Sequence, residues 1–284
     1  MQRQQEEDLA GKVAIITGSS RGIGKQAAVA LARRGVKVVV TARTVDPGQS
    51  DLPGTVGQTV AEIEALGGEA VAVGADLASE EDLKRVVQTA VDWFGGVDIL
   101  INNAAVTSDH NMTADPLDLP RADWLYHFAV NVHAPFTLVQ LVAPIMEERG
   151  GGRILNVTTG SGEVLRLVEE PRKTESLGDF SLLMPAYYSS KRALDRFANV
   201  MMPVLAKKNI FIISLMPGLA ASPIALHRVK TAGMDDSVMV PLDVPARMLA
   251  YFAACTDPLE YAGRIFFAER ELAELGLSLD PALS

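Results

Sequence analysis

The sequence of 284 residues contains a single cysteine, Cys255, and aromatic residues make up only 6% of it. One cysteine excludes an internal disulfide, so nothing in the sequence points to an oxidising compartment. Basic residues are also in the minority, because 26 Lys and Arg stand against 35 Asp and Glu, for a formal net charge of −9. Proteins that bind nucleic acid or anionic lipid concentrate positive charge. We therefore expect neither as a partner.

The start of the chain, MQRQQEEDLAGK, lacks the apolar core of a secretory signal. One internal stretch, Ala129–Met146, is long and apolar enough to raise the question of a transmembrane helix. It contains Asn131, His133 and Gln140, however, which favour a buried helix of a globular protein. The expected localisation is the cytoplasm.

Short apolar, β-branched runs alternate along the chain with longer segments of helical spacing. Strands that are apolar throughout are buried on both faces, which is typical of a parallel sheet. The alternation predicts an α/β fold with a doubly wound central sheet of about seven parallel strands. The predicted strands are 12–17, 36–42, 70–74, 97–101, 153–157, 210–215 and 264–267. The predicted helices lie near 24–34, 56–66, 80–94, 124–149, 186–208 and 244–254.

No repeat or linker divides the sequence, so we expect one domain over residues 11–284 after an N-terminal extension of residues 1–10. Three insertions depart from the regular alternation and are expected to form loops, at 44–55, 163–185 and 220–240. Long loops in compact domains are usually functional. The loops 163–185 and 220–240 are therefore expected to shape the substrate pocket, although the leucines of the first would equally pack it onto the protein.

A glycine-rich turn, TGSSRGIG, joins the first predicted strand to the first predicted helix at 17–24. Glycines there let the backbone approach a pyrophosphate, and the following helix directs its free N–H groups at the phosphate. A tight turn without a ligand is the simpler reading, but the position favours a dinucleotide. The expected contacts are Gly18, Ser20, Arg21, Gly22, Ile23 and Gly24.

The end of the second predicted strand bears on the choice of dinucleotide. An acidic residue there holds the adenosine ribose of NAD. This sequence has Ala42 followed by Arg43, and Arg21 lies in the glycine turn. Two guanidinium groups suit a 2′-phosphate, so we expect NADP(H), with NAD(H) possible if Arg43 only ends a surface strand.

Tyr187 and Lys191 lie four residues apart in a predicted helix and therefore share one face. A phenol has a pKa of roughly 10 and is a poor base at neutral pH. A neighbouring ammonium should lower that pKa, as alcohol oxidation by a general base requires. An isolated pair of this kind would be an ordinary helix face.

The pair is not isolated, and together with other motifs it resembles the short-chain dehydrogenase/reductase family over nearly the whole chain. TGSSRGIG resembles the family's TGxxxGxG turn, and Asn102–Ala105 resembles its NNAG motif with Ala105 in place of glycine. Asp76, Asn131 and Pro217–Gly218 match further family positions. The resemblance implies a Rossmann fold and adds these cofactor contacts: Asp76, Leu77, Asn103, Ala104, Ala105, Tyr187, Lys191, Pro217 and Gly218.

The resemblance also implies the chemistry. Tyr187 would pass a proton to or from the oxygen of a ketone, aldehyde or secondary alcohol, and Lys191 would bind the nicotinamide ribose. Asn131 would support Lys191, through a water, in a proton relay. Family members form homotetramers or homodimers, so an oligomer is expected here.

One catalytic position departs from the family, which has a serine after the fifth strand. In this sequence Thr159 occupies that position and keeps the hydroxyl, and Ser161 is the alternative. The expected catalytic set is therefore Asn131, Thr159, Tyr187 and Lys191, with the serine alternative open.

The same sequence features bear on other functions. A non-catalytic relative that keeps the cofactor fold as a sensor or scaffold is the main alternative. Enoyl reduction or dehalogenation is disfavoured because the Tyr-to-Lys spacing and the glycine turn are intact. No metal is expected, since one cysteine and four scattered histidines show no zinc-ligand spacing. The sequence does not select a substrate among carbonyl compounds.

Overall fold

Seven parallel strands form one sheet in the order β3-β2-β1-β4-β5-β6-β7 in the computed structural model, which describes residues 6–107, 116–159, 184–231, 233 and 235–279. The strands are β1 (Val13–Thr17), β2 (Lys37–Ala42), β3 (Ala70–Gly74), β4 (Ile99–Asn102), β5 (Gly152–Val157), β6 (Ile210–Met216) and β7 (Ile265–Phe267). The predicted seven-stranded doubly wound sheet is confirmed, and each strand begins and ends within two residues of its predicted limits. The four central strands β1, β4, β5 and β6 are almost wholly buried, as apolar runs predict.

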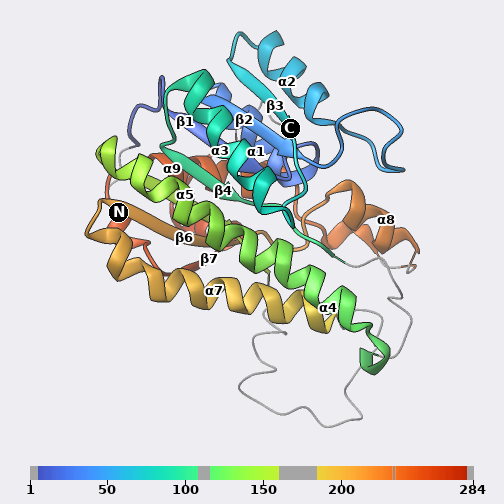
Figure 1. The fold of residues 1–284 in the computed structure, drawn as a ribbon. Helices are drawn as coiled ribbons and strands as arrows, with labels where there is room; N and C mark the ends of the chain where they lie inside the picture. Colours follow the sequence, from blue (N-terminus) through green and yellow to red (C-terminus); the bar gives the residue numbers. More distant parts are fainter. Residues whose placement is uncertain (1–5, 108–115, 160–183, 232, 234, 280–284) are drawn as a thin grey trace.

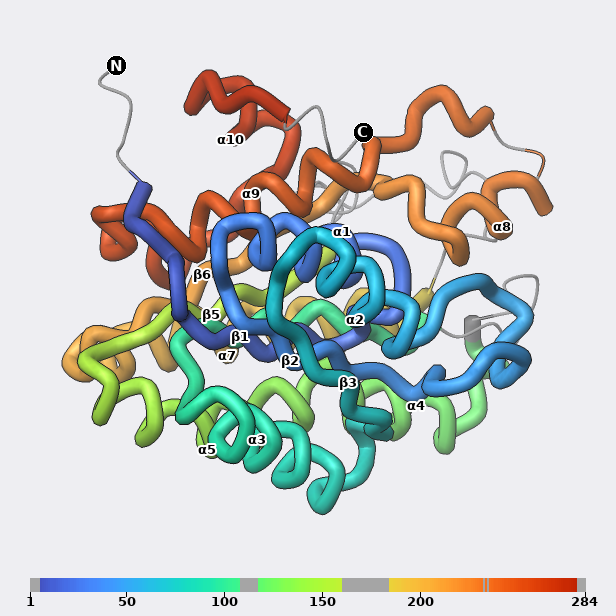
Figure 2. Tube along the Cα trace, turned by 90° about the horizontal axis from the view of Figure 1, so that it is seen from above, coloured from blue at the N-terminus to red at the C-terminus, as the bar shows by residue number. Residues whose placement is uncertain are grey.

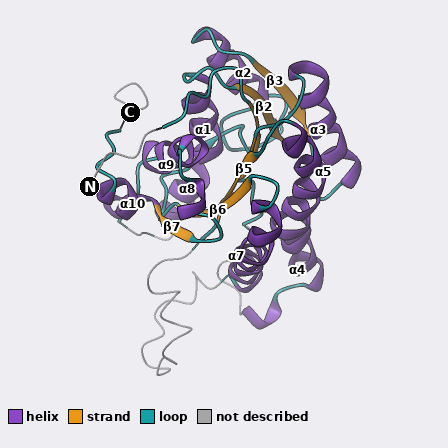
Figure 3. Ribbon diagram, turned by 90° about the vertical axis from the view of Figure 1, so that its left-hand side faces the viewer, coloured by secondary structure: helices purple, strands orange, loops and turns teal. Residues whose placement is uncertain are grey.

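Helices cover both faces of the sheet (Figure 1). They are α1 (Gly22–Ala32), α2 (Val56–Ala65), α3 (Glu80–Phe94), α4 (Arg121–Phe128), α5 (Ala134–Glu148), α7 (Pro185–Ala206), α8 (Pro223–Thr231), α9 (Asp243–Ala254) and α10 (Ala268–Glu274). The core on one face draws on α1, α2 and α9, and the core on the other draws on α3, α5 and α7. Figures 2 and 3 show the sheet between these two layers.

The starts of three helices follow from their local sequence. Thr55 and Gln58 form a reciprocal capping box at the start of α2. The side chain of Ser79 caps α3, whose first turn is acidic, and Gly95 ends that helix at φ 83°. In contrast, α1 begins at Gly22, its N-cap residue Arg21 makes no side-chain capping bond, and its first turn has no acidic residue. The free N–H groups of α1 therefore face the glycine turn.

The helix predicted near 124–149 is interrupted. It consists of α4, a π-helical turn at Ala129–His133, and α5. The wider turn contains Asn131, which is fully buried. Short π-helical turns inside helices occur frequently at functional sites, so the interruption itself marks this position.

The three predicted loops differ in outcome. Residues 44–55 contain no helix or strand. The segment 220–240 was expected to be a loop but contains α8 and the 3-10 turn Asp236–Val238, because Pro223 is suited to begin a helix. Residues 160–183 lie outside the described residues, so the predicted substrate loop 163–185 is described only at Met184, the N-cap of α7, and at Pro185, the first residue of that helix. In the N-terminal extension, Leu9 is buried against the core.

The long apolar segment Arg121–Glu148 has an 18-residue window of mean hydropathy 1.4, of which 39% is buried, so its length and composition would allow it to cross a membrane. In the structure it packs against α3 and α7. On the outer surfaces of α5 and α7, Phe136, Val200 and Val204 are 43%, 55% and 53% exposed. The homotetramer or homodimer and the cytoplasmic localisation stay predictions.

Candidate active site and cofactor cleft

Because all seven strands are parallel, the loops after their carboxyl ends gather at one edge of the sheet. The strand order reverses between β1 and β4, and open α/β sheets bind ligands at such a point. Predicted site residues follow six of these strands: the glycine turn follows β1, Arg43 follows β2, Asp76 follows β3, Asn103 follows β4, Thr159 follows β5 and Pro217 follows β6. The topology thus brings motifs from across the sequence to one edge.

The glycine turn is held against the loop after β4. The Asn103 side chain donates to the carbonyls of Thr17 at 2.8 Å and Gly18 at 3.2 Å, and the Thr17 hydroxyl accepts from the backbone of Asn103 and Ala104. A Cβ on Gly24 would lie 2.5 Å from the Gly18 carbonyl oxygen and against the Asn103 amide. Only glycine fits there, so the turn keeps the short path that a pyrophosphate needs.

Two arginines, Arg21 after β1 and Arg43 after β2, provide cations at this edge of the sheet. The Arg21 guanidinium donates to Ser50 at 3.0 Å, to Thr44 at 3.1 Å and to the Gly54 carbonyl at 2.9 Å, so loop 44–55 fixes its position. Burial, and then the charge of Arg43, lower the pKa of Arg21, so the two positive charges repel each other. The Nε atom of Arg21 is buried without a partner among the described residues. This arrangement fits a phosphate group.

The remaining predicted cofactor residues also lie along this edge. Asp76 accepts from the backbone of Ala78 at 3.0 Å in the turn that leads into α3, and Leu77 is buried beside it. Ala105, which replaces the family's glycine, is exposed and its backbone is not left-handed, so the methyl group causes no strain. Gly218 has φ 73°, and a Cβ there would press on Val240 at 2.6 Å.

Tyr187 lies at the first turn of α7, and the side chain of Thr159 lies near enough to its phenol to lower the pKa of the phenol as a hydrogen-bonding group. Thr159 is thus placed beside Tyr187, whereas Ser161 lies outside the described residues, so the assignment of the serine's role to Thr159 stays a prediction. Burial raises the pKa of the Tyr187 phenol, and Tyr188 adds to the rise, while Thr159 and Arg228 oppose it. The expected lowering of this pKa by Lys191 is wrong, because burial dominates and raises it.

Lys191 is almost wholly buried, with 2% of its surface exposed. Its Nζ atom donates to the Val157 carbonyl at 2.8 Å, at the end of the strand that leads to Thr159. Burial lowers the pKa of Lys191 to about 8, and the carboxylate of Asp195 acts in the opposite direction. The ammonium is thus held at the end of β5, on the same helix as Tyr187.

The Asn131 side chain ties the loop after β4 to α7. Its Oδ1 accepts from the Val106 N–H at 2.8 Å, and its Nδ2 donates to the Ser190 hydroxyl at 2.9 Å. Ser190 in turn donates to the Tyr187 carbonyl at 2.8 Å. The amide therefore joins the residue next to Lys191, and its water-mediated link to Lys191 itself stays a prediction.

The Thr159 assignment gives a direct test. Thr159→Val removes the hydroxyl at nearly constant volume and is expected to lower kcat roughly 10- to 100-fold, since a hydrogen bond to a charged group contributes about 1.5–3 kcal/mol. Thr159→Ser should keep most of the activity. Steady-state rates of both variants and of Ser161→Ala decide the matter, and an inactive Ser161→Ala beside an active Thr159→Val would move the hydroxyl role to Ser161.

Sequence reasoning missed two charged residues beside the Tyr–Lys pair. Asp195 follows Lys191 by one helical turn, accepts from Arg192 at 3.0 Å, and has a side chain only 6% exposed. Its spacing on α7 was a usable signal. Arg228, on α8, acts on the charge of Tyr187. Nothing in the sequence marked it, because α8 itself was expected to be a loop.

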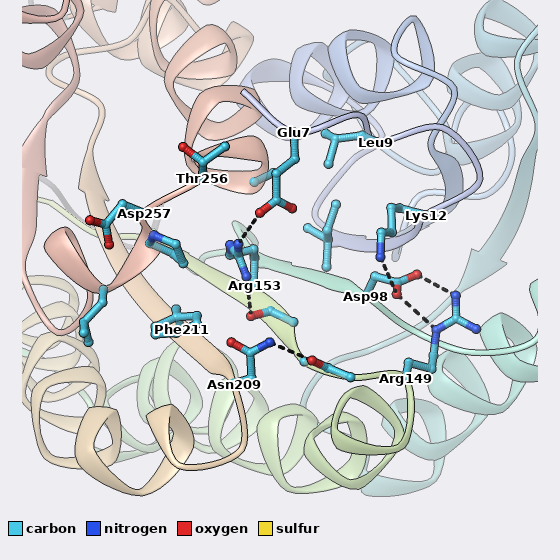
Figure 4. Close-up of a pocket in the computed structure, with 17 residues that line it drawn as sticks. Glu7, Leu9, Lys12, Asp98, Arg149, Arg153, Asn209, Phe211, Thr256 and Asp257 are labelled. Carbon is cyan, nitrogen blue, oxygen red and sulfur yellow. Dashed lines mark hydrogen bonds and ion pairs between the residues drawn. The ribbon is translucent and has the colours of Figure 1, made fainter. Parts of the chain in front are cut away.

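A separate pocket of about 350 Å³ lies at the opposite, amino-terminal edge of the strands (Figure 4). Its charged side chains pair with one another: Arg149 donates to Asp98 at 2.8 Å and Arg153 to Glu7 at 3.4 Å. Lys12 also lies 3.7 Å from Asp98. These pairs neutralise the walls, and we regard the carboxyl edge as the functional site.

The doubly wound sheet and the motif residues gathered at its switch point are those of a dinucleotide-binding α/β protein. The short chain dehydrogenase family model matches residues 12–169. The chain is 36% identical over 231 residues to 7alpha-hydroxysteroid dehydrogenase of Escherichia coli (strain K12), which covers 81% of this chain and 79% of the relative. It is 31% identical over 214 residues to a 3-oxoacyl-acyl-carrier-protein reductase of Synechocystis sp., with 75% and 76% covered.

A solved 7 alpha-hydroxysteroid dehydrogenase, complexed with NADH and 7-oxo glycochenodeoxycholic acid, superimposes with a TM-score of 0.72 at 30% identity, covering 91% of this chain and 93% of that one. The chain therefore belongs to the short-chain dehydrogenase/reductase family. It is an enzyme of that family, acting on CH–OH groups with NAD(P) as acceptor.

Proposed function

We propose that the protein is an NADP(H)-dependent oxidoreductase that interconverts a secondary alcohol and a ketone, or an aldehyde, with Tyr187 as the general acid and base. The observation that carries the proposal is the contact of the Tyr187 phenol with Thr159 at the carboxyl edge of the sheet, with Lys191 buried on the same helix. The bound nicotinamide supplies the hydride chemistry, and the protein supplies position and proton transfer.

The raised pKa of Tyr187 supports its role as acid in the reducing direction, because a protonated phenol can donate to a carbonyl oxygen. Thr159 would orient that oxygen by a second hydrogen bond. Lys191 would turn from the Val157 carbonyl to the ribose hydroxyls, where its charge favours the phenolate that remains after proton transfer. Asn131 would hold the loop after β4 in register with α7.

Preference for NADP(H) is supported by the pair of guanidinium groups after β1 and β2. Arg21 is anchored by three groups of loop 44–55, and its charge is repelled by that of Arg43. A 2′-phosphate would relieve this repulsion and occupy the cations with charge-assisted hydrogen bonds. Arg43 is exposed and donates to the Tyr126 hydroxyl at 2.9 Å, so it is free to reorient at little cost.

Arg43→Ala is expected to raise the KM for NADPH roughly 10- to 100-fold and to change the KM for NADH less than about twofold, because only NADPH carries the 2′-phosphate. Initial rates with both cofactors against one carbonyl substrate measure the change. Arg270→Ala, at an exposed arginine whose side chain is 62% exposed on α10, is the matched control. Wild-type turnover that is equal or better with NADH at matched concentration would contradict the preference.

A further inference from the structure

Asp195 continues a stripe of functional residues along α7. It lies one helical turn after Lys191, which itself lies one turn after Tyr187, so the three side chains share one face of the helix. Lys191 and Asp195 are both buried, with 2% and 7% of their surfaces exposed. Asp195 is therefore placed to act on the same reaction as the two residues before it.

The end of β5 meets this face of α7. The Val157 carbonyl accepts from the Lys191 Nζ atom at 2.8 Å. The next residue, Thr158, is 1% exposed and lies near enough to Asp195 to lower the pKa of its carboxyl as a hydrogen-bonding group. The Thr158 N–H is in turn held by the Leu215 carbonyl at 2.9 Å. Lys191 and Asp195 therefore lie against the same strand end.

The carboxylate of Asp195 interacts with two cations. One of its oxygens, Oδ2, accepts from Arg192 at 3.0 Å, and the side chain of Arg192 is 34% exposed. The other, Oδ1, is buried and has no hydrogen-bond partner among the described residues. A buried carboxylate is costly unless a cation offsets its charge. Lys191 is a buried cation that does so, because each of the two groups favours the charged form of the other.

The elements packed on α7 bring few other charges to this face. The strand β6 contains no titratable residue, and the one in β5 is Arg153, near the opposite end of the strand. The partly or wholly buried titratable residues of the remaining packed elements, α4, α5 and the π-helical turn, are Asp123, Tyr126 and His127. The charge that acts on the pKa of Lys191 is that of Asp195.

We propose that Asp195 is a positioning residue for the reaction: its carboxylate keeps the Lys191 side chain protonated and so preserves the charge that stabilises the Tyr187 phenolate. The inference rests on the proposed function, in which Tyr187 donates the proton. Burial lowers the pKa of Lys191 to about 8 even beside this carboxylate. Without the carboxylate the lysine would lose its proton nearer to neutral pH, because an opposite charge favours the charged form.

Asp195→Asn removes the charge and keeps the shape of the side chain. With saturating NADPH, the wild-type rate of carbonyl reduction should fall as pH rises through about 8, where Lys191 loses its proton. In Asp195→Asn this fall should lie roughly one pH unit lower, while kcat at pH 6 stays within roughly threefold of wild type. Asp195→Ser, a second uncharged variant, should show the same displaced profile.

Two further variants control for the loss of a buried acid. Asp195→Glu keeps the charge and should keep the wild-type pH profile. Asp243→Asn removes another buried carboxylate, 6% exposed, from α9 on the other face of the sheet, and should keep that profile too. A loss of rate of the same size at every pH in Asp195→Asn would give Asp195 a purely structural role and overturn the inference.

The pKa of Lys191 can also be followed without catalysis, by NMR titration of protein that carries ¹³C-labelled lysine, in which Lys191→Met identifies the resonance. A lower pKa of Lys191 in Asp195→Asn than in wild type supports the inference even if the enzyme reduces no carbonyl. Equal values in the two proteins would contradict it, and the proposed function would still stand if reduction depends on Tyr187.

Discussion

Tyr187→Phe is expected to lower kcat about 10³-fold, because it removes one hydroxyl that donates the proton to the carbonyl oxygen and general acid catalysis typically contributes 10²- to 10⁴-fold. Cofactor affinity should stay unchanged, since the aromatic ring and the fold remain. Stopped-flow or steady-state NADPH oxidation measures the rate, and NADPH fluorescence titration measures the affinity.

Tyr188→Phe provides the matched control. Tyr188 packs edge-to-face on Tyr187 with ring centroids 5.5 Å apart and also has its pKa raised by burial. It follows Tyr187 directly but is not bonded to Thr159 in the structure. We expect Tyr188→Phe to keep near wild-type kcat. Comparable losses in both variants would point to aromatic packing rather than to proton transfer.

Lys191→Met is expected to lower kcat on the order of 10²- to 10³-fold, the scale of removing a preorganised charge that stabilises a developing anion. It should also raise the KM for the cofactor, because the proposed contact with the ribose is lost. Tyr187→Phe should not share that second effect. Initial rates at varied cofactor concentration measure both constants, and an unchanged cofactor KM would argue against the ribose contact.

The same variant should change how stability depends on pH. Burial lowers the pKa of Lys191 from 10.5 to about 8 in the folded protein. Between these pH values the unfolded chain binds more protons, so this lysine makes the free energy of unfolding rise with pH across the window. The difference in pKa corresponds to about 3 kcal/mol by linkage. Urea unfolding from pH 7.5 to 10.5 should show this rise in wild type relative to Lys191→Met, and parallel curves would contradict it.

Much of the fold was predictable because burial on both faces leaves a simple pattern. Ile210–Met216 and Ile99–Asn102 are buried at every position. Their largely apolar sequences were therefore enough to locate these two strands. Helix α8 was missed because Pro223 and Gly233 punctuate the surrounding segment, and such residues read as a loop. The π-helical turn at Ala129–His133 was also missed, since its residues have ordinary helical spacing.

The site was predictable where a motif has fixed spacing and a local cause. Gly24 must be glycine for the turn to close, and Lys191 lies one helical turn after Tyr187. Both residues could therefore be predicted from the sequence. The direction in which the pKa of Tyr187 shifts could not be predicted, because it depends on burial by residues distant in the chain. The place of Arg228 beside Thr107 could not be predicted either, because only the fold brings these two residues together.

The central claim is that the enzyme transfers a hydride from the nicotinamide to a carbonyl carbon while Tyr187 donates a proton to the carbonyl oxygen. Deuterium transfer from labelled cofactor to product measures this most directly. NADPH labelled with deuterium on one face of C4 is incubated with the enzyme and a panel of oxo compounds, and the products are analysed by mass spectrometry. We predict that the wild-type enzyme transfers deuterium to the carbinol carbon from NADPH labelled on one face of C4 and not from NADPH labelled on the other. Tyr187→Phe should form almost no alcohol in the same time. Cofactor binding without labelled alcohol from any compound would contradict the account and favour a non-catalytic member of the family.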